Sequence, residues 1–176
     1  MSRPLSGARF EGVVRKAVEE YGMIRSGDRI AVGLSGGKDS ACLAWALARL
    51  KRYAPYSFDL VAIHLQPGFP GDDPAAPDRL ADFCGTLGIP FVPIPTRIGS
   101  IVLSGRDRST PCSLCANLRR GILHTAALER GCRTVALGHH RDDAVETLLL
   151  NLFYGGRLHC FAPVTDLDRR GIRVIR

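Results

Sequence analysis

Apolar residues form short runs of strand length along the chain, and longer apolar-rich segments lie between these runs. The short runs, bounded by turn residues, predict buried strands at residues 29–34, 58–65, 90–95 and 133–138. The longer segments predict helices at residues 6–23, 39–52, 77–87, 112–131 and 140–154. The prolines of the third strand indicate a sheet edge. Residues 161–176 are typical of a hairpin that turns at Arg169, Arg170 and Gly171.

This alternation of strands and helices predicts an α/β fold with a doubly wound, mainly parallel sheet and helices on both faces. We expect an N-terminal helix within residues 1–25 and one domain over residues 26–176. The sequence shows no internal repeat. In such folds ligands gather at the carboxyl ends of the strands, so chemistry is expected where the strands end.

Charge and composition limit the partners. The formal net charge is +7, and almost all basic residues are arginines, which suit bidentate phosphate contacts. This excess fits a nucleic-acid partner, although charge alone favours an ordinary solvated surface. We find no apolar run long enough to span a bilayer and no signal-peptide core, so we expect a cytoplasmic protein without a membrane partner. Residues 96–111 form a long connection that carries Arg97, Arg106 and Arg108.

The chain has six cysteines. Cys42 and Cys84 lie in apolar segments, where cysteine is usually a core residue. Cys112 and Cys115 form a CxxC pair, which indicates a metal, a cluster or redox chemistry. A pair of core cysteines on a helix is the alternative reading of this spacing.

A glycine loop follows the first strand and precedes a buried helix. Two glycines let backbone N–H groups converge, and a lysine and a helix N-terminus add positive charge, so the loop predicts a polyphosphate site. Its residues are Ser35, Gly36, Gly37, Lys38, Asp39 and Ser40. The loop is not a Walker A motif, because Val32 stands where the first glycine is needed and Asp39 where the Ser or Thr is needed. The alternative is a plain strand–helix turn.

A second loop, residues 138–143, follows the fourth strand, so we expect it to meet the glycine loop around one nucleotide. Gly138 and His139 are candidate nucleotide contacts at the strand end. Asp142 and Asp143 can help to hold Mg²⁺ beside phosphates, and we take Asp39 and Asp143 as the candidate ligands. Both acids could equally be residues that the dipole favours at a helix N-terminus.

The motif SGGKDS resembles the signature of the PP-loop ATP pyrophosphatase superfamily, which has an adenine nucleotide alpha hydrolase-like fold. Three further segments are similar to the tRNA 2-thiocytidine synthetase family, the cluster-dependent tRNA thiolases. They are CSLC followed by ANLRRGIL, GHHRDDAVETLLLN, and FYGGRL at residues 153–158. The resemblance runs from about Phe10 to the last residue.

This resemblance implies ATP-dependent 2-thiolation of a tRNA cytidine. The C2 oxygen is adenylated with release of pyrophosphate, and sulfur then displaces AMP. It implies ATP, Mg²⁺ and a 4Fe–4S cluster as cofactors, with tRNA and a sulfur donor such as a cysteine desulfurase as partners. Lys38, Asp39, Cys112 and Cys115 carry the chemistry, and the two cysteines are two of the three cluster ligands. The sequence leaves open whether the protein is a homodimer.

The third cluster cysteine of the family lies in a C-terminal region beyond Arg176, so we expect part of the family domain to be missing. Cys132 and Cys160 remain as substitutes, although neither lies in a matching motif. Three alternatives stay open: a lysidine-forming or thiouridine-forming tRNA enzyme, an inactive module that binds ATP or tRNA, and zinc in place of the cluster, bound by Cys112, Cys115 and further ligands.

Overall fold

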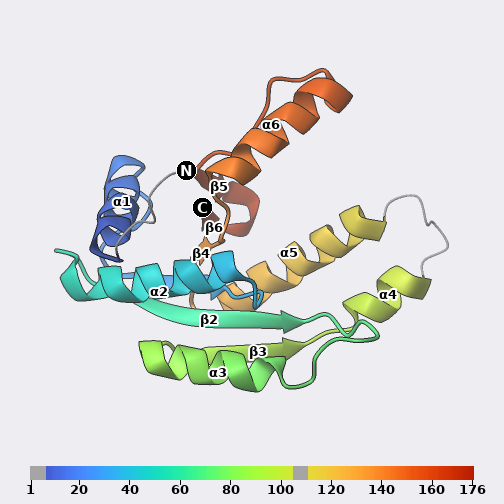
Figure 1. The fold of residues 1–176 in the computed structure, drawn as a ribbon, viewed down its shortest axis with the longest axis horizontal. Coiled ribbons are helices and arrows are strands. Elements are labelled where there is room, and N and C mark those ends of the chain that lie inside the picture. The colour runs from blue at the N-terminus through green and yellow to red at the C-terminus, as the bar shows by residue number, and fades with distance from the viewer. Residues whose placement is uncertain (1–6, 105–110) are drawn as a thin grey trace.

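The structure, a computed structural model, describes residues 7–104 and 111–176. Its helices and strands follow one another in alternation along most of the chain (Figure 1). In chain order they are α1 (Gly7–Glu20), β1 (Asp28–Gly33), α2 (Lys38–Tyr53), β2 (Phe58–Gln66), α3 (Ala76–Leu87), β3 (Phe91–Pro95), α4 (Ile98–Ser104), α5 (Pro111–Glu129), β4 (Thr134–Ala136), α6 (Arg141–Gly155), β5 (Val164–Leu167), a 3-10 turn (Asp168–Arg170) and β6 (Ile172–Ile175).

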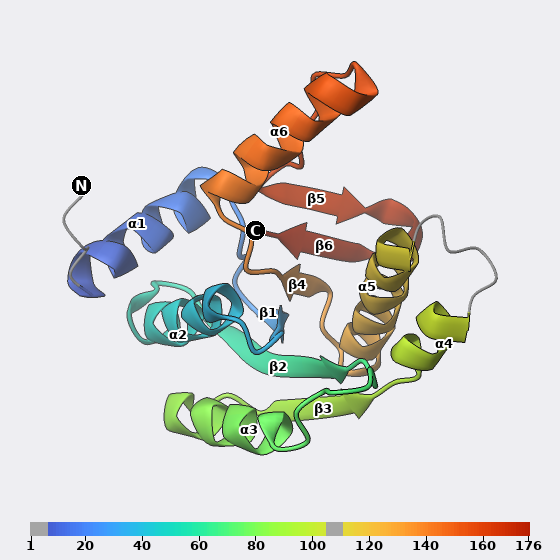
Figure 2. The ribbon, with the colours of Figure 1, turned by 45° about the vertical axis from the view of Figure 1, so that its right-hand side comes forward.

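The described residues form one six-stranded sheet in the order β3-β2-β1-β4-β6-β5. Every neighbouring pair is parallel except β5 and β6, which form the predicted antiparallel hairpin (Figure 2). β3 is an edge strand, as its prolines predict. The chain runs outward from β1 to β3 and then returns to place β4 on the other side of β1. The carboxyl ends of β1 and β4 therefore flank the switch point of the sheet, where such folds bind ligands.

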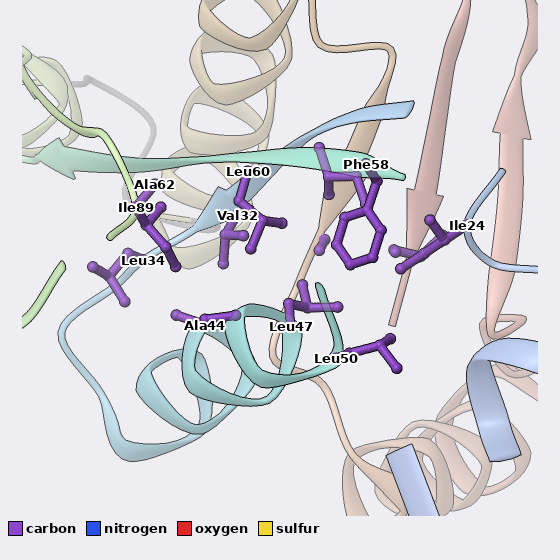
Figure 3. Packing of buried hydrophobic residues seen from close by; sticks show 14 of the residues in the cluster. Ile24, Val32, Leu34, Ala44, Leu47, Leu50, Phe58, Leu60, Ala62 and Ile89 are labelled. Atoms are coloured by element: carbon purple, nitrogen blue, oxygen red, sulfur yellow. The ribbon is translucent and has the colours of Figure 1, made fainter. Parts of the chain in front are cut away.

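Alternating residues of the central strands feed two separate cores. Val32 and Leu60 point to the face covered by α2 and α3, where they pack with Leu47 (Figure 3). Ala31 belongs to the opposite core, which is built against α5. This period of two, with both faces apolar, explains why the strands read as continuous hydrophobic runs, and it confirms helices on both faces.

The predicted N-terminal helix is present as α1, which packs on the outer side of α2. Phe10 lies against Trp45, with ring centroids 6.1 Å apart, and the Arg49 guanidinium donates to the Glu11 carboxylate over 2.9 Å. α2 is therefore enclosed between the sheet and α1, which accounts for apolar residues nearly all round it. The division of the chain at residue 25 stays a prediction.

Several expectations need correction. The connection after β3 is not wholly irregular, because α4 occupies its first part and contacts α5. Arg106 and Arg108 lie outside the described residues. Cys84 is buried as expected, but Cys42 is exposed on α2, because it follows the first turn on the side away from the sheet.

The last helix, α6, extends away from the sheet in both views (Figures 1 and 2), and none of its residues is buried. Among the described helices, none is both long and apolar enough to cross a membrane.

Candidate active site

The glycine loop is held in shape by its own serines. The Ser40 hydroxyl donates to the Gly37 carbonyl over 2.9 Å and accepts from the Ser35 amide over 3.1 Å. The Ser35 hydroxyl in turn accepts from the Gly37 amide over 3.3 Å. Gly36 has φ +88°, a conformation that side chains disfavour, so a glycine is required at this point of the turn. Ser40 is buried, and it acts as the internal brace of the loop.

The loop ends at Gly37, which caps the N-terminus of α2 without a side-chain hydrogen bond. The first intrahelical bond reaches back from the Ala41 amide to Gly37, so the amides before Ala41 have no partner within the helix. These amides and the helix dipole suit an anion. Lys38 adds a charge: its Nζ lies 3.0 Å from both Asp39 carboxylate oxygens, and this contact raises the pKa of the lysine.

The second loop touches the glycine loop directly, which confirms that the two loops meet. A Cβ added to Gly138 would lie 2.9 Å from the Asp39 carbonyl carbon and 2.9 Å from the Ser40 amide nitrogen. Only a glycine allows the loop after β4 to approach the first turn of α2 this closely. The His140 ring lies across the same junction, with Nε2 4.0 Å from the Asp39 carboxylate.

The two acids of the second loop differ in their roles. The Asp143 carboxylate accepts from the His140 amide over 2.8 Å, and His140 Nδ1 accepts from the Asp142 amide over 3.2 Å, which together form a capping box. The His140 amide bond holds the pKa of Asp143 below its usual value. Asp143 therefore has a capping role at the start of α6, and Asp142 is largely exposed.

Asp39 and Asp143 suit Mg²⁺ because both offer carboxylate oxygens as ligands. Asp39 and Asp143 both raise the pKa of Lys38, so both carboxylates act on the same ammonium group. Carboxylate oxygens beside phosphates are the ligands that Mg²⁺ prefers. Within residues 7–104 and 111–176, no cluster of three or more His, Cys, Asp or Glu side chains is arranged to hold a metal ion, so the phosphates would have to complete such a site.

A cavity of about 360 Å³ lies between the two loops and α5. On the loop side it is lined by six of the predicted nucleotide contacts: Ser35, Gly37, Asp39, Ser40, Gly138 and His139. Gly36, Lys38, Asp142 and Asp143 do not line it. The opposite wall is one stripe of α5, which we call the α5 stripe: Ala116, Arg119, Arg120, Leu123 and His124. These positions share one helix face because they are spaced by three and four residues.

The CxxC pair continues the α5 stripe toward the helix N-terminus. Cys112 lies four residues before Ala116, and Cys115 lies four residues before Arg119. Cys112 is exposed and Cys115 is half-buried, one turn apart in the first part of α5. Two thiols at this spacing can bind one metal centre, and the helix N-terminus favours their negative charge. Cys112 and Cys115 do not line the cavity themselves, but as a pair they fit two ligands of a cluster on the same helix.

The structure excludes Cys132 as the third ligand. Cys132 follows the far end of α5 and is 0 % exposed in the core beneath that helix. The 17 residues from Cys112 to Glu129 correspond to about 25 Å along the helix axis. Burial raises the pKa of the Cys132 thiol, which suits a core residue. Cys160 is half-buried, and its thiol donates to the Ala144 carbonyl over 3.2 Å.

His124 is a site residue that we did not predict. It is 2 % exposed, yet it lines the cavity. Burial lowers its pKa, and the charges of Arg170, Arg120 and Arg176 lower it further, so the imidazole is neutral near pH 7. The signal was available in the sequence, because His124 continues the helical spacing of Cys112, Ala116 and Arg120.

Comparison with known proteins identifies the family of the chain. A profile of the PP-loop domain family matches residues 8–176. A tRNA-cytidine(32) 2-sulfurtransferase of Methylococcus capsulatus is 45% identical over 172 residues, which cover 96% of this chain and 57% of that protein. The same enzyme of Aeromonas salmonicida is 48% identical over 167 residues, which cover 93% of this chain and 53% of that protein. The chain thus spans about half the length of the curated relatives it matches.

Among solved structures, the fold matches a U34-tRNA thiolase from Methanococcus maripaludis that contains a [4Fe-4S] cluster. The TM-score is 0.69 at 29% identity, and the match covers 83% of this chain and 50% of that one. The family profile covers almost the whole chain, and the thiolase structure shares its fold. This chain belongs to the PP-loop domain family.

Proposed function

We propose that this chain is the ATP-dependent part of a tRNA sulfurtransferase that converts cytidine 32 of tRNA to 2-thiocytidine. One observation carries the proposal: a single cavity has the glycine loop on one wall, and the helix stripe that continues into the CxxC pair on the other. Activation by ATP and delivery of sulfur would then act on a nucleotide between the two walls. The names of the relatives support the substrate and the position.

In the first step, the C2 oxygen of the cytidine attacks the α-phosphorus of ATP, and pyrophosphate leaves. The free amides at the start of α2 bind the pyrophosphate and stabilise the charge that it gains. Lys38, which extends from the same turn, adds a full positive charge. Asp39 and Asp143 would hold Mg²⁺, which neutralises phosphate charge when bound. The product is a cytidine with AMP on its C2 oxygen.

In the second step, a sulfur nucleophile attacks C2, the bond from C2 to oxygen breaks, and AMP leaves with that oxygen. Splitting the exchange in two avoids direct displacement of a poor leaving group. Cys112 and Cys115 would hold a 4Fe–4S cluster, which supplies a site for the sulfur when bound. The target base must leave its stack to enter the cavity, as other base-modifying enzymes require.

The test combines the anaerobically purified chain, iron, sulfide, ATP and tRNA, and measures AMP and pyrophosphate together with the mass of the modified nucleoside. We expect that AMP forms only when tRNA is present, and that the tRNA then carries 2-thiocytidine at position 32. Lys38→Ala should slow AMP formation, because the developing pyrophosphate charge loses its cation. Cys112→Ser should abolish 2-thiocytidine and leave ATP binding intact.

The outcomes separate the alternatives. A 2-thiouridine product would assign the chain to the activity named for the Methanococcus maripaludis structure, and a lysine adduct would indicate a lysidine-forming enzyme. Tight binding of ATP and tRNA without AMP, unaffected by Cys112→Ser, would contradict the proposal and support a binding module. Zinc in place of iron and sulfide would remove the cluster from the mechanism.

A further inference from the structure

The wall of the cavity opposite the glycine loop carries the positive charges of Arg119 and Arg120. Arg120 and His124 lie four residues apart on the α5 stripe, so their side chains lie on one helix face about 5–6 Å apart at Cβ. Arg120 is exposed to the cavity, and His124 is buried behind it. This wall is separate from the loop that holds pyrophosphate in the proposed function.

Neighbouring cations add to this positive charge. Within the described residues, the positive charges of Arg120, Arg170 and Arg176 each lower the pKa of His124. The charge of Arg120 also lowers the pKa of His139 and of Arg176. Like charges gathered beside a partly enclosed cavity repel one another, and an anion placed among them relieves that repulsion.

One of these groups, Arg176, is fixed by other partners and does not need the anion to position it. The Arg176 guanidinium donates to the Ala162 carbonyl over 2.9 Å and to the Thr165 hydroxyl over 3.0 Å. It also lies over Phe161, 5.2 Å from the ring centroid, and Phe161 packs on His139. Arg176 therefore supplies a fixed background charge, whereas Arg120 lines the cavity itself.

We propose that Arg120 and His124 form a second phosphate site, which binds a nucleotide phosphate other than the pyrophosphate held by the glycine loop. The guanidinium offers two parallel N–H donors to phosphate oxygens, and the neutral imidazole offers an N–H without adding charge. Leu123, which also lines the cavity and is buried, adds an apolar surface beside them.

The position of the site indicates its use. Arg120 lies five residues beyond Cys115, about 7.5 Å along the helix axis, between the CxxC pair and the buried end of the stripe. A phosphate bound here would place its nucleotide between the cysteines and the glycine loop. This inference rests on the proposed function for the identity of the nucleotide. The phosphate is either the phosphodiester of the target RNA or the single phosphate of the adenylate.

The test measures equilibrium binding of pyrophosphate, AMP and unmodified tRNA to the chain and to Arg120→Gln. Arg52→Gln is the matched control: it removes the same charge from an exposed arginine in the last turn of α2, away from the cavity. We expect Arg120→Gln to weaken one phosphate-bearing ligand by about tenfold to a hundredfold, the loss of one charge-assisted contact. Pyrophosphate affinity should stay within about twofold of the control, a shift too small for a lost contact.

Binding of AMP and binding of tRNA distinguish the two sources of the phosphate. If Arg120→Gln weakens only AMP binding, the site holds the phosphate of the adenylate. A loss confined to tRNA, with the slope of log affinity against log salt reduced by about one, assigns it to the RNA backbone. His124→Leu should weaken binding of the same ligand. His124→Gln, which keeps an N–H donor, should bind that ligand almost as tightly as the unchanged chain. Equal affinities of Arg120→Gln and Arg52→Gln for all three ligands would overturn the proposal. Because binding is measured without turnover, a chain that forms no AMP can still pass or fail this test.

Discussion

Gly138 and Asp39 are 99 positions apart in the chain, and they are in backbone contact: a Cβ on Gly138 would lie 2.9 Å from the Asp39 carbonyl carbon. This contact joins the end of β4 to the first turn of α2. It therefore fixes the position of the second loop against the glycine loop on one side of the cavity.

Gly138→Ala should weaken ATP binding at least about tenfold, because the new methyl group meets backbone that cannot move without displacing the start of α2. Calorimetry with ATP and thermal unfolding provide the measurements. Gly85→Ala is the control, since a Cβ there meets nothing within 4 Å, and alanine within α3 should stabilise the chain by about 0.5–1 kcal/mol. Unchanged ATP affinity in Gly138→Ala would count against the contact.

The two ends of α5 should respond differently to loss of a thiol. Cys112→Ser should abolish binding of iron and sulfide with little change in stability, because this cysteine is exposed. Cys132→Ala should leave iron and sulfide binding unchanged and lower the free energy of unfolding by about 1 kcal/mol, because it opens a small void in the core. Metal analysis and urea unfolding check both; loss of the cluster in Cys132→Ala would refute the assignment of Cys132 to the core.

The contact between α1 and α2 should be measurable. Glu11 and Arg49 are 2.9 Å apart and only partly exposed, and Arg49 also lies over the rings of Trp45 and Tyr53. Glu11→Gln should destabilise the chain by about 0.5–1 kcal/mol, the value of a partly exposed ion pair. Arg49→Met should cost more, because it also removes both cation–π contacts. The exposed pair Arg15 and Glu19 is the control, and Glu19→Gln should change stability very little.

Stability should fall as the pH is lowered through the ordinary histidine range. Burial lowers the pKa of His124 and of His139 from 6.5 in the folded chain, so the unfolded chain binds more protons below that value. The free energy of unfolding is therefore highest above pH 6.5, and it decreases as the pH falls from 6.5 toward the pKa of the folded state. Urea unfolding at pH 7.5, 6.5 and 5.5 should show the decline, and His124→Gln should make it shallower. An equal decline in that variant would show that His124 does not contribute.

Much of the fold followed from local patterns. The strand-length apolar runs, the prolines of β3 and the turn at Gly171 predicted the parallel sheet, its edge and the final hairpin, because backbone geometry and turn chemistry act over a few residues. The glycine loop was also recognisable, since a tight turn before a helix needs glycine and leaves amides unpaired. Family resemblance added the assignment to the PP-loop proteins, which the comparisons confirm.

Only the tertiary structure decided which side chains share the site. Asp143 caps α6, Cys132 lies in the core and Cys42 lies outside it, although each sequence context allowed another role. His124 became part of the cavity because α5 crosses the sheet with that stripe facing the glycine loop. The physical reason is that burial and partner choice depend on elements far apart in the chain, whereas a sequence pattern reports only the face that a residue shares with its near neighbours.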